Sequence, residues 1–241
     1  TPLKESCGSI FPVLAPSKGD AHKTGEWNTL RIVADWPRLQ VWINDTPVQD
    51  VDLATHPELR WRLRRGYLGI ESLSYPIRLR NLRIRELPSK DRWQTLYAAP
   101  QDWDKWFLAE GKEETWERLG PVLRCDGLGY LATKQQYRDF EFQSYIRHIT
   151  HCNGGVLFRA DRDPKSERRY EIQIHDVWGA TYPTGSLYHF ERSRYPRVRP
   201  EEWFLFQLAV KADWCLVRID GETVMEHKGL QNLEPGHILL Q

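Results

Sequence analysis

GEWNTLRIVADWPRLQVWINDTPV, residues 25–48, reads against PEEWFLFQLAVKADWCLVRIDGETV, residues 200–224. Trp27 aligns with Trp203 at an offset of 176 residues (203 − 27), and the same offset aligns the apolar positions that follow. A repeat of this length indicates two copies of one fold rather than a short-period solenoid.

Helical periodicity is almost absent from the chain, and short apolar-polar alternations bounded by turn residues take its place. Asn44-Asp45 and Asp220-Gly221 are hairpin signals at the same place in both copies. Many close strands with Gly and Pro turns predict an all-β sandwich or barrel. The expected strands are 27–34, 38–44, 66–72, 77–87, 115–126, 130–134, 139–149, 154–160, 170–176, 203–210 and 215–221.

Composition excludes some classes of function. The chain has 34 Lys and Arg against 33 Asp and Glu, so it lacks the basic excess of a nucleic-acid-binding protein. No long apolar run predicts a membrane span. None of the four cysteines forms a close pair with metal-finger spacing. The 11 Trp and ten Tyr fit sugar-stacking platforms in an all-β protein, because flat rings pack against pyranose C–H faces.

Several motifs in a fixed order resemble the 3-keto-disaccharide hydrolase-like family. They are YLATKQQYRDFEFQSYIR (130–147), NGGVLFRA (153–160), YEIQIHD (170–176), TGSLY (184–188) and GHILLQ (236–241), with GSIFPVLAPSKG (8–19) and GYLGIE (66–71) in the first copy. The resemblance implies a concanavalin A-like jelly-roll β-sandwich and an extracellular or periplasmic protein. It also implies a saccharide ligand, a glycoside whose C3 hydroxyl has been oxidised to a ketone.

The two copies are incomplete in different ways. The first has no counterpart of residues 93–184, and the second stops where the first continues into YPIRLRNLRIREL, residues 75–87. We therefore expect a tandem repeat with a partial first copy. Residues 1–90 would be the C-terminal half of a first jelly roll, and 91–241 a second jelly roll without its last strand. Missing segments or another chain would complete them, or residues 75–87 would enter the sheet of the second copy.

The candidate site follows from strand alternation, which puts every second side chain on one face. In residues 170–176, Glu171, Gln173 and His175 share the face opposite the core. Arg159 should point to the same face from the neighbouring strand. Further expected site residues are Glu141, which extends the polar row; Asp176, which a bulge would swing inward; and Trp178 and Tyr188, which with Tyr182 and Tyr195 supply aromatic rings from the long segment 178–200. The competing interpretation is a solvated polar sheet face.

The implied substrate suggests a mechanism. A ketone at C3 acidifies the C2 hydrogen, so a base can form an enolate that expels the group on C1, and water addition completes a net hydrolysis. Glu171 or His175 is then the base, Arg159 and Gln173 hold the oxygens, and Asp176 is the other proton-transfer group. These roles are exchangeable.

Two other functions stay open at this point. A laminarinase-like glycoside hydrolase uses two carboxylates on one strand, but Gln173 and Asp176 depart from its Glu-x-Asp-x-(x)-Glu pattern. A carbohydrate-binding module without catalysis fits the tandem organisation and the aromatic loop. Jelly rolls of this type often hold a structural calcium, and an acidic loop with Asp161, Asp163 and Glu167 could supply oxygen ligands for one. The spacing of these residues matches no EF-hand, so a charged loop is the preferred interpretation and we assign no metal or cofactor.

Overall fold

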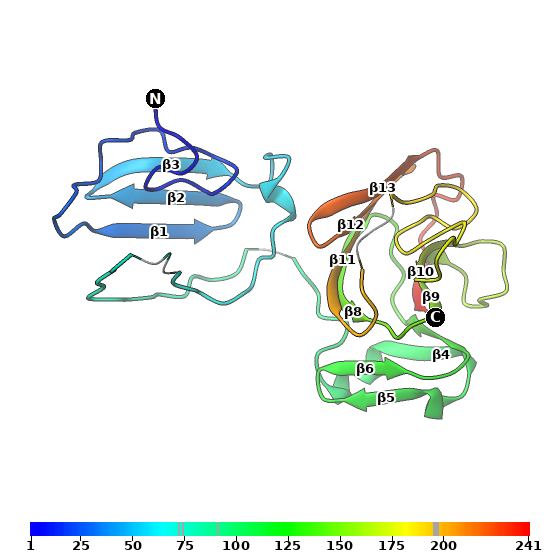
Figure 1. Ribbon diagram of the computed structural model, residues 1–241. Coiled ribbons are helices and arrows are strands. Elements are labelled where there is room, and N and C mark those ends of the chain that lie inside the picture. Colours follow the sequence, from blue (N-terminus) through cyan, green and yellow to red (C-terminus); the bar gives the residue numbers. More distant parts are fainter. Residues whose placement is uncertain (72, 74, 91, 195–197) are drawn as a thin grey trace. The chain divides into compact units, whose positions relative to one another are not determined.

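The computed structural model describes residues 1–71, 73, 75–90, 92–194 and 198–241. The chain divides into two compact units, Thr1–Trp93 and Gln94–Gln241, which are described separately (Figure 1). Among the described residues, no helix is long and apolar enough to cross a membrane.

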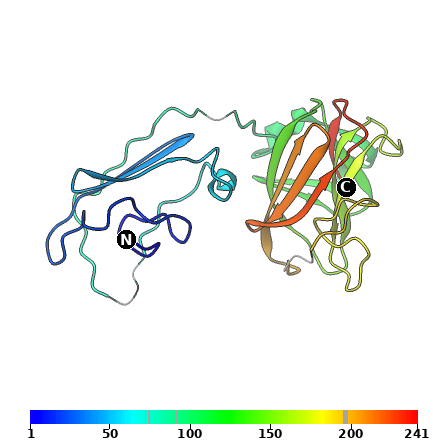
Figure 2. The same cartoon turned by 90° about the horizontal axis from the view of Figure 1, so that it is seen from above.

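The second unit is a jelly-roll sandwich of two antiparallel sheets (Figures 1 and 2). The first sheet has the order β10-β9-β14-β7-β4 and the second has the order β13-β12-β11-β8. Their strands are β4 (Trp106–Gly111), β7 (Gly129–Thr133), β8 (Phe140–Arg147), β9 (Asn153–Ala160), β10 (Tyr170–His175), β11 (Trp203–Lys211), β12 (Trp214–Ile219), β13 (Glu222–Lys228) and β14 (His237–Leu240). The expected strand 115–126 is instead a hairpin of β5 (Trp116–Leu119) and β6 (Val122–Cys125). Two short 3₁₀ helices also occur in this unit, η2 (Pro100–Lys105) and η3 (Glu113–Thr115).

Apolar side chains from the two sheets meet in one core. Phe158 and Ile172 come from the five-stranded sheet, and Phe206 and Val217 from the four-stranded sheet. All four are fully buried, and each is worth about 1.5–3 kcal/mol relative to an exposed side chain. Cys215 lies in the same core, as a small hydrophobic residue. This packing fixes which face of each strand is left for a site.

In its described residues, the first unit contains one three-stranded sheet, β1-β2-β3. Its strands are β1 (Leu30–Asp35), β2 (Arg38–Ile43) and β3 (Thr46–Asp52), followed by the 3₁₀ helix η1 (Leu59–Trp61). Strands β2 and β3 correspond residue for residue to β12 and β13 at the offset of 176 (214 − 38 and 222 − 46). The irregularity after Val41 in the first ladder also recurs after Val217 in the second.

Backbone features of the repeat agree as well. Asn44 and Asp45 have φ of 47° and 63°, and Asp220 and Gly221 have φ of 48° and 84°, so both hairpins close with two left-handed residues, as a type I′ turn requires. These correspondences support the proposal that the first unit is the C-terminal half of a first jelly roll, with the second unit as the other copy of the fold.

One glycine precedes the strands β1–β3 of the first unit and another precedes β11–β13 of the second, and glycine is required at both positions for two reasons. Gly8 and Gly185 both have φ of +87°, which disfavours any residue with a Cβ. A Cβ on Gly8 would also lie 2.8 Å from Val48 Cγ2, and one on Gly185 would lie 2.8 Å from Val224 Cγ2. The chain therefore approaches the same edge of the ladder in both units.

The expected strands 66–72 and 77–87 are wrong. In the described residues 66–71, 73 and 75–90 there is no strand, and the large apolar side chains are exposed apart from Leu87, which is half-buried. Residues 75–87 also do not enter either sheet of the second unit, whose strands all begin at or after Trp106. The physical reason is that a strand needs a partner: β14, the counterpart of residues 66–71, pairs with β9 and β7, and the first unit has neither.

Candidate functional site

The strand β10 presents alternate side chains to the core and to the outside, as its sequence predicts. Ile172 and Ile174 pack on the core, so Glu171, Gln173 and His175 face outward from the five-stranded sheet. Space for Glu171 is made by Gly155 on β9, because a Cβ there would lie 2.8 Å from Glu171 Oε1.

Glu171 is a half-buried carboxyl group. Burial raises its pKa above the usual value for glutamate, and the positive charge of Arg169 opposes this rise. Burial also raises the pKa of the Tyr130 phenol, to which the charge of Glu171 contributes. The Tyr130 hydroxyl accepts a hydrogen bond of 2.9 Å from Gln241 Nε2. Glu171, Tyr130 and Arg169 thus form one electrostatic group beside Gly155.

Gln173 is the most buried polar residue of this face, with 5% of its surface exposed. Its Nε2 donates a 2.6 Å hydrogen bond to Asn153 Oδ1. Its Oε1 is buried and has no hydrogen-bond partner within the described part of the chain. A buried acceptor of this kind is costly unless something donates to it, so Gln173 can accept a ligand hydroxyl. Next on the strand, His175 is held through its backbone N–H, which donates to Thr184 Oγ1 at 2.9 Å.

The floor and rim of this face combine apolar and aromatic groups. Leu157, Leu239 and Ala132 form a buried cluster next to Tyr130 and Phe107. Along the edge of β10, the backbone N–H of Tyr188 donates to the Glu171 carbonyl at 2.9 Å. The ring of Tyr188 lies 4.0 Å from that of His189 and 5.3 Å from that of Tyr182. Trp178 is 90% exposed in the same segment, and Tyr195 lies outside the described residues.

Arg159 does not line the groove. Its side chain is 0% exposed and its guanidinium donates to the carbonyls of Arg138, Ala212 and Asn232 and to Asp139 Oδ1. The reason is its φ of 47°, which breaks the alternation of β9 and turns the side chain toward the core, near Cys215. Arg159 is a structural residue, and the expectation that it holds substrate oxygens is wrong.

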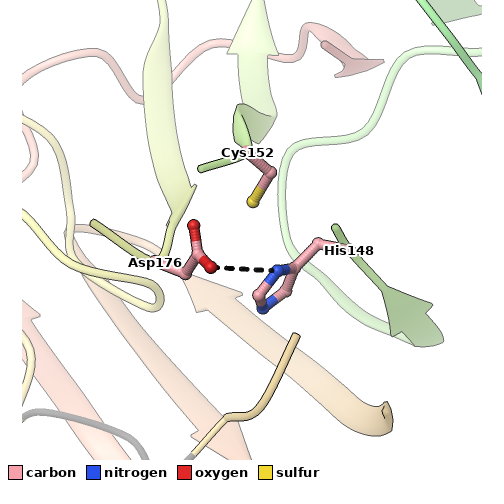
Figure 3. Close-up of side chains that lie close together, drawn as sticks. All are labelled: His148, Cys152 and Asp176. Carbon is pink, nitrogen blue, oxygen red and sulfur yellow. Dashed lines mark ion pairs between the residues drawn. The ribbon is translucent and has the colours of Figure 1, made fainter. Parts of the chain in front are cut away.

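Two further expected site residues lie elsewhere. Glu141 is on β8 of the four-stranded sheet, so its exposed side chain faces the opposite side of the sandwich from Glu171. Asp176 turns to the core side, where its carboxylate meets His148 and Cys152 (Figure 3). Neither extends the row that Glu171, Gln173 and His175 form.

The His148–Cys152–Asp176 cluster was not predicted from the sequence. No local sequence pattern joins the three residues, because they follow or precede three separate strands, β8, β9 and β10. Burial and the charge of Asp176 raise the pKa of the Cys152 thiol to about 12. In the acidic loop, by contrast, Asp161 is paired with Arg168 and Ser166, and within the described residues Asp161, Asp163 and Glu167 do not form a metal-binding group.

The model of the 3-keto-alpha-glucoside-1,2-lyase-like domain matches residues 1–85 and 93–241. The chain belongs to this family. It is thus a member of a carbohydrate-active family, as the motifs of the second unit indicated. A search of curated proteins found no match.

Several solved structures are similar to this chain, and the first named here shares its fold. A presumed glycosyl hydrolase from Parabacteroides distasonis ATCC 8503 is 21% identical, with a TM-score of 0.51 over 57% of this chain and 90% of its own. A second from the same organism is 16% identical, with a TM-score of 0.49 over 57% of this chain and 82% of its own. The carbohydrate-binding module CBM66 from Bacillus subtilis is 17% identical, with a TM-score of 0.40 over 56% and 86%.

Proposed function

We propose that the outer face of β10 and β9 binds a glycoside with a ketone at C3, and that Glu171 starts its cleavage by removing the C2 proton. The observation that carries this proposal is a half-buried carboxyl with a raised pKa beside Gln173, whose buried Oε1 has no partner among the described residues. A carboxylate with a raised pKa is a stronger base than an exposed one, and the free amide oxygen accepts a sugar hydroxyl.

The reaction is an elimination followed by addition of water. Glu171 takes the C2 hydrogen as a proton, and the electron pair of the C–H bond forms an enolate with the C3 ketone. The enolate then forms the C1–C2 double bond and expels the C1 oxygen, which takes a proton. Addition of water across the new double bond gives the products of hydrolysis.

The neighbours of Glu171 suggest the remaining roles. Tyr130 interacts electrostatically with Glu171 and keeps its proton, so it is the donor to the leaving oxygen. Arg169, whose charge also reaches Glu171, offsets the charge of the enolate. His175 is four residues from Glu171, about 13 Å along an extended strand. That distance suits a contact with the adjoining sugar better than a shared proton transfer.

A carbohydrate-binding module is the second candidate. The observation that favours it is that Arg159 and Asp176, two of the groups expected to assist catalysis, are turned away from this face. The aromatic rings of Tyr182, Tyr188 and Trp178 then suffice for sugar stacking. On this view the face binds saccharides without changing them.

One assay separates the two functions. The protein is incubated with a 3-keto disaccharide and with its unoxidised parent, and released monosaccharide is measured by chromatography. Release from the 3-keto sugar alone supports elimination, and Glu171→Gln should lower the rate by about 10²–10⁴-fold while saccharide binding is kept. Glu141→Gln is the matched control, because Glu141 lies on the opposite sheet. Binding without release by the wild-type protein, or an unchanged rate in Glu171→Gln, would refute the catalytic proposal.

A further inference from the structure

Three polar side chains meet at one end of the sandwich, where the chain passes between the sheets (Figure 3). His148 follows β8 of the four-stranded sheet, Cys152 precedes β9, and Asp176 follows β10 of the five-stranded sheet. We propose that His148, Cys152 and Asp176 bind a divalent transition-metal ion, with Zn²⁺ as the best match. This site is separate from the face that carries Glu171.

The spacing of the three groups fits coordination. One ligand atom from each lies within 4.8 Å of the others. His148 Nδ1 and Asp176 Oδ2 are 3.8 Å apart, which is too long for a hydrogen bond. Two ligands at about 2.1 Å from a tetrahedral Zn²⁺ are about 3.4 Å from each other. Binding therefore requires His148 Nδ1 and Asp176 Oδ2 to close by a few tenths of an ångström. Ligand atoms that are as much as 4.8 Å apart must close by about 1 Å.

Burial gives an independent reason for a ligand here. The side chains of His148 and Asp176 are 4% and 8% exposed. Asp176 Oδ1 is buried without a hydrogen-bond partner in the described residues. Figure 3 shows the carboxylate directed toward the space that Cys152 and His148 share. A buried carboxylate is rarely left with so few partners, because buried charges are normally paired or bound to metal.

The donor set selects the metal. One sulfur, one imidazole nitrogen and one carboxylate oxygen are ligands that Zn²⁺ accepts together, whereas Ca²⁺ and Mg²⁺ prefer oxygen alone. Three protein ligands leave one tetrahedral position open. His148 Nδ1 donates a hydrogen bond of 3.1 Å to the Ile149 carbonyl oxygen, so this nitrogen must lose its proton and give up that bond when it binds the metal. A metal ion at this position would connect the two sheets.

The test uses the whole protein treated with a chelator and then titrated with Zn²⁺ or Co²⁺. We expect one tightly bound Zn²⁺ per chain and, with Co²⁺, a thiolate-to-cobalt charge-transfer absorption. Cys152→Ser should remove this absorption and weaken Zn²⁺ binding by at least about 100-fold, since even residues behind the ligands cost up to this much. Cys125→Ser is the matched control, because Cys125 is an exposed free thiol outside the cluster, and it should bind as the wild type does.

The cobalt spectrum of the wild-type protein decides the question even where Cys152→Ser does not fold. A spectrum without thiolate absorption, or no stoichiometric Zn²⁺ binding, would overturn the proposal. Equal loss of binding in Cys125→Ser and Cys152→Ser would also overturn it, because the thiol would then not be specific. Asp176→Asn gives a second check, and Zn²⁺ binding unchanged in this variant contradicts the assigned ligand set.

Discussion

Replacing Arg159 with methionine tests whether this residue is structural or catalytic. Methionine keeps much of the volume but removes all four hydrogen bonds of the guanidinium, three of them to backbone carbonyls and one to Asp139. Hydrogen bonds to a charged group contribute about 1.5–3 kcal/mol each. The Asp139 side chain is 44% exposed, so water can take the place of the guanidinium there and reduce the cost of losing that hydrogen bond. Breaking one side of a buried charged network costs about 3–5 kcal/mol in total. We expect Arg159→Met to lower the free energy of unfolding by about 3–5 kcal/mol.

The assay is urea denaturation at neutral pH, followed by tryptophan fluorescence. Arg138→Met is the control, because the Arg138 side chain is 64% exposed, and it should change the free energy of unfolding by less than about 0.5 kcal/mol. The free energy of unfolding of Arg159→Lys should lie between those of Arg159→Met and Arg138→Met, since an ammonium group keeps the charge but cannot reach all four acceptors as the guanidinium does. An Arg159→Met variant as stable as the wild type but unable to cleave sugar would refute the structural role and return Arg159 to the site.

Three further predictions concern other parts of the second unit. Because burial raises the folded-state pKa of Glu171, stability should fall as pH rises from the unfolded pKa through the folded one, and Glu171→Gln should abolish this part of the pH dependence in denaturation curves. Gly185→Ala should destabilise the fold by more than Gly179→Ala, which has φ of +79° but no atom within 4 Å of its new Cβ; equal losses, expected at about 1–3 kcal/mol from backbone strain alone, would show that the contact with Val224 does not matter. A thiol reagent should label two cysteines quickly in the native protein and the other two only after unfolding, and rapid labelling of all four would contradict the burial pattern of Cys7 and Cys125 against Cys152 and Cys215.

Local signals in the sequence were enough for the hairpins and for the alternation of β10. The turn at Asn44-Asp45 and the one at Asp220-Gly221 depend on residues that accept positive φ, so the sequence shows them directly. The outward row of Glu171, Gln173 and His175 needs only the period of two, which core packing of Ile172 enforces.

Features that depend on distant parts of the chain were not predictable in this way. Arg159 left its expected face because a non-glycine residue took positive φ, which has no marker in the sequence. Glu141 alternates correctly, but alternation does not say which sheet a strand joins. The cluster of Cys152 with Asp176 depends on where β10 ends relative to the crossing of the sheets. Residues 66–71 and 75–87 lack strands because the described part of the first unit has no counterparts of β7 and β9.

The edge position of β8 has a consequence for handling the protein. An outermost strand has backbone donors and acceptors that can template the addition of another chain, and such strands are often guarded by charge. Glu141 and Arg147, both exposed on β8, are suited to act as gatekeepers against edge-to-edge aggregation. Exchanging both for valine should make edge-to-edge self-assembly of the protein more frequent.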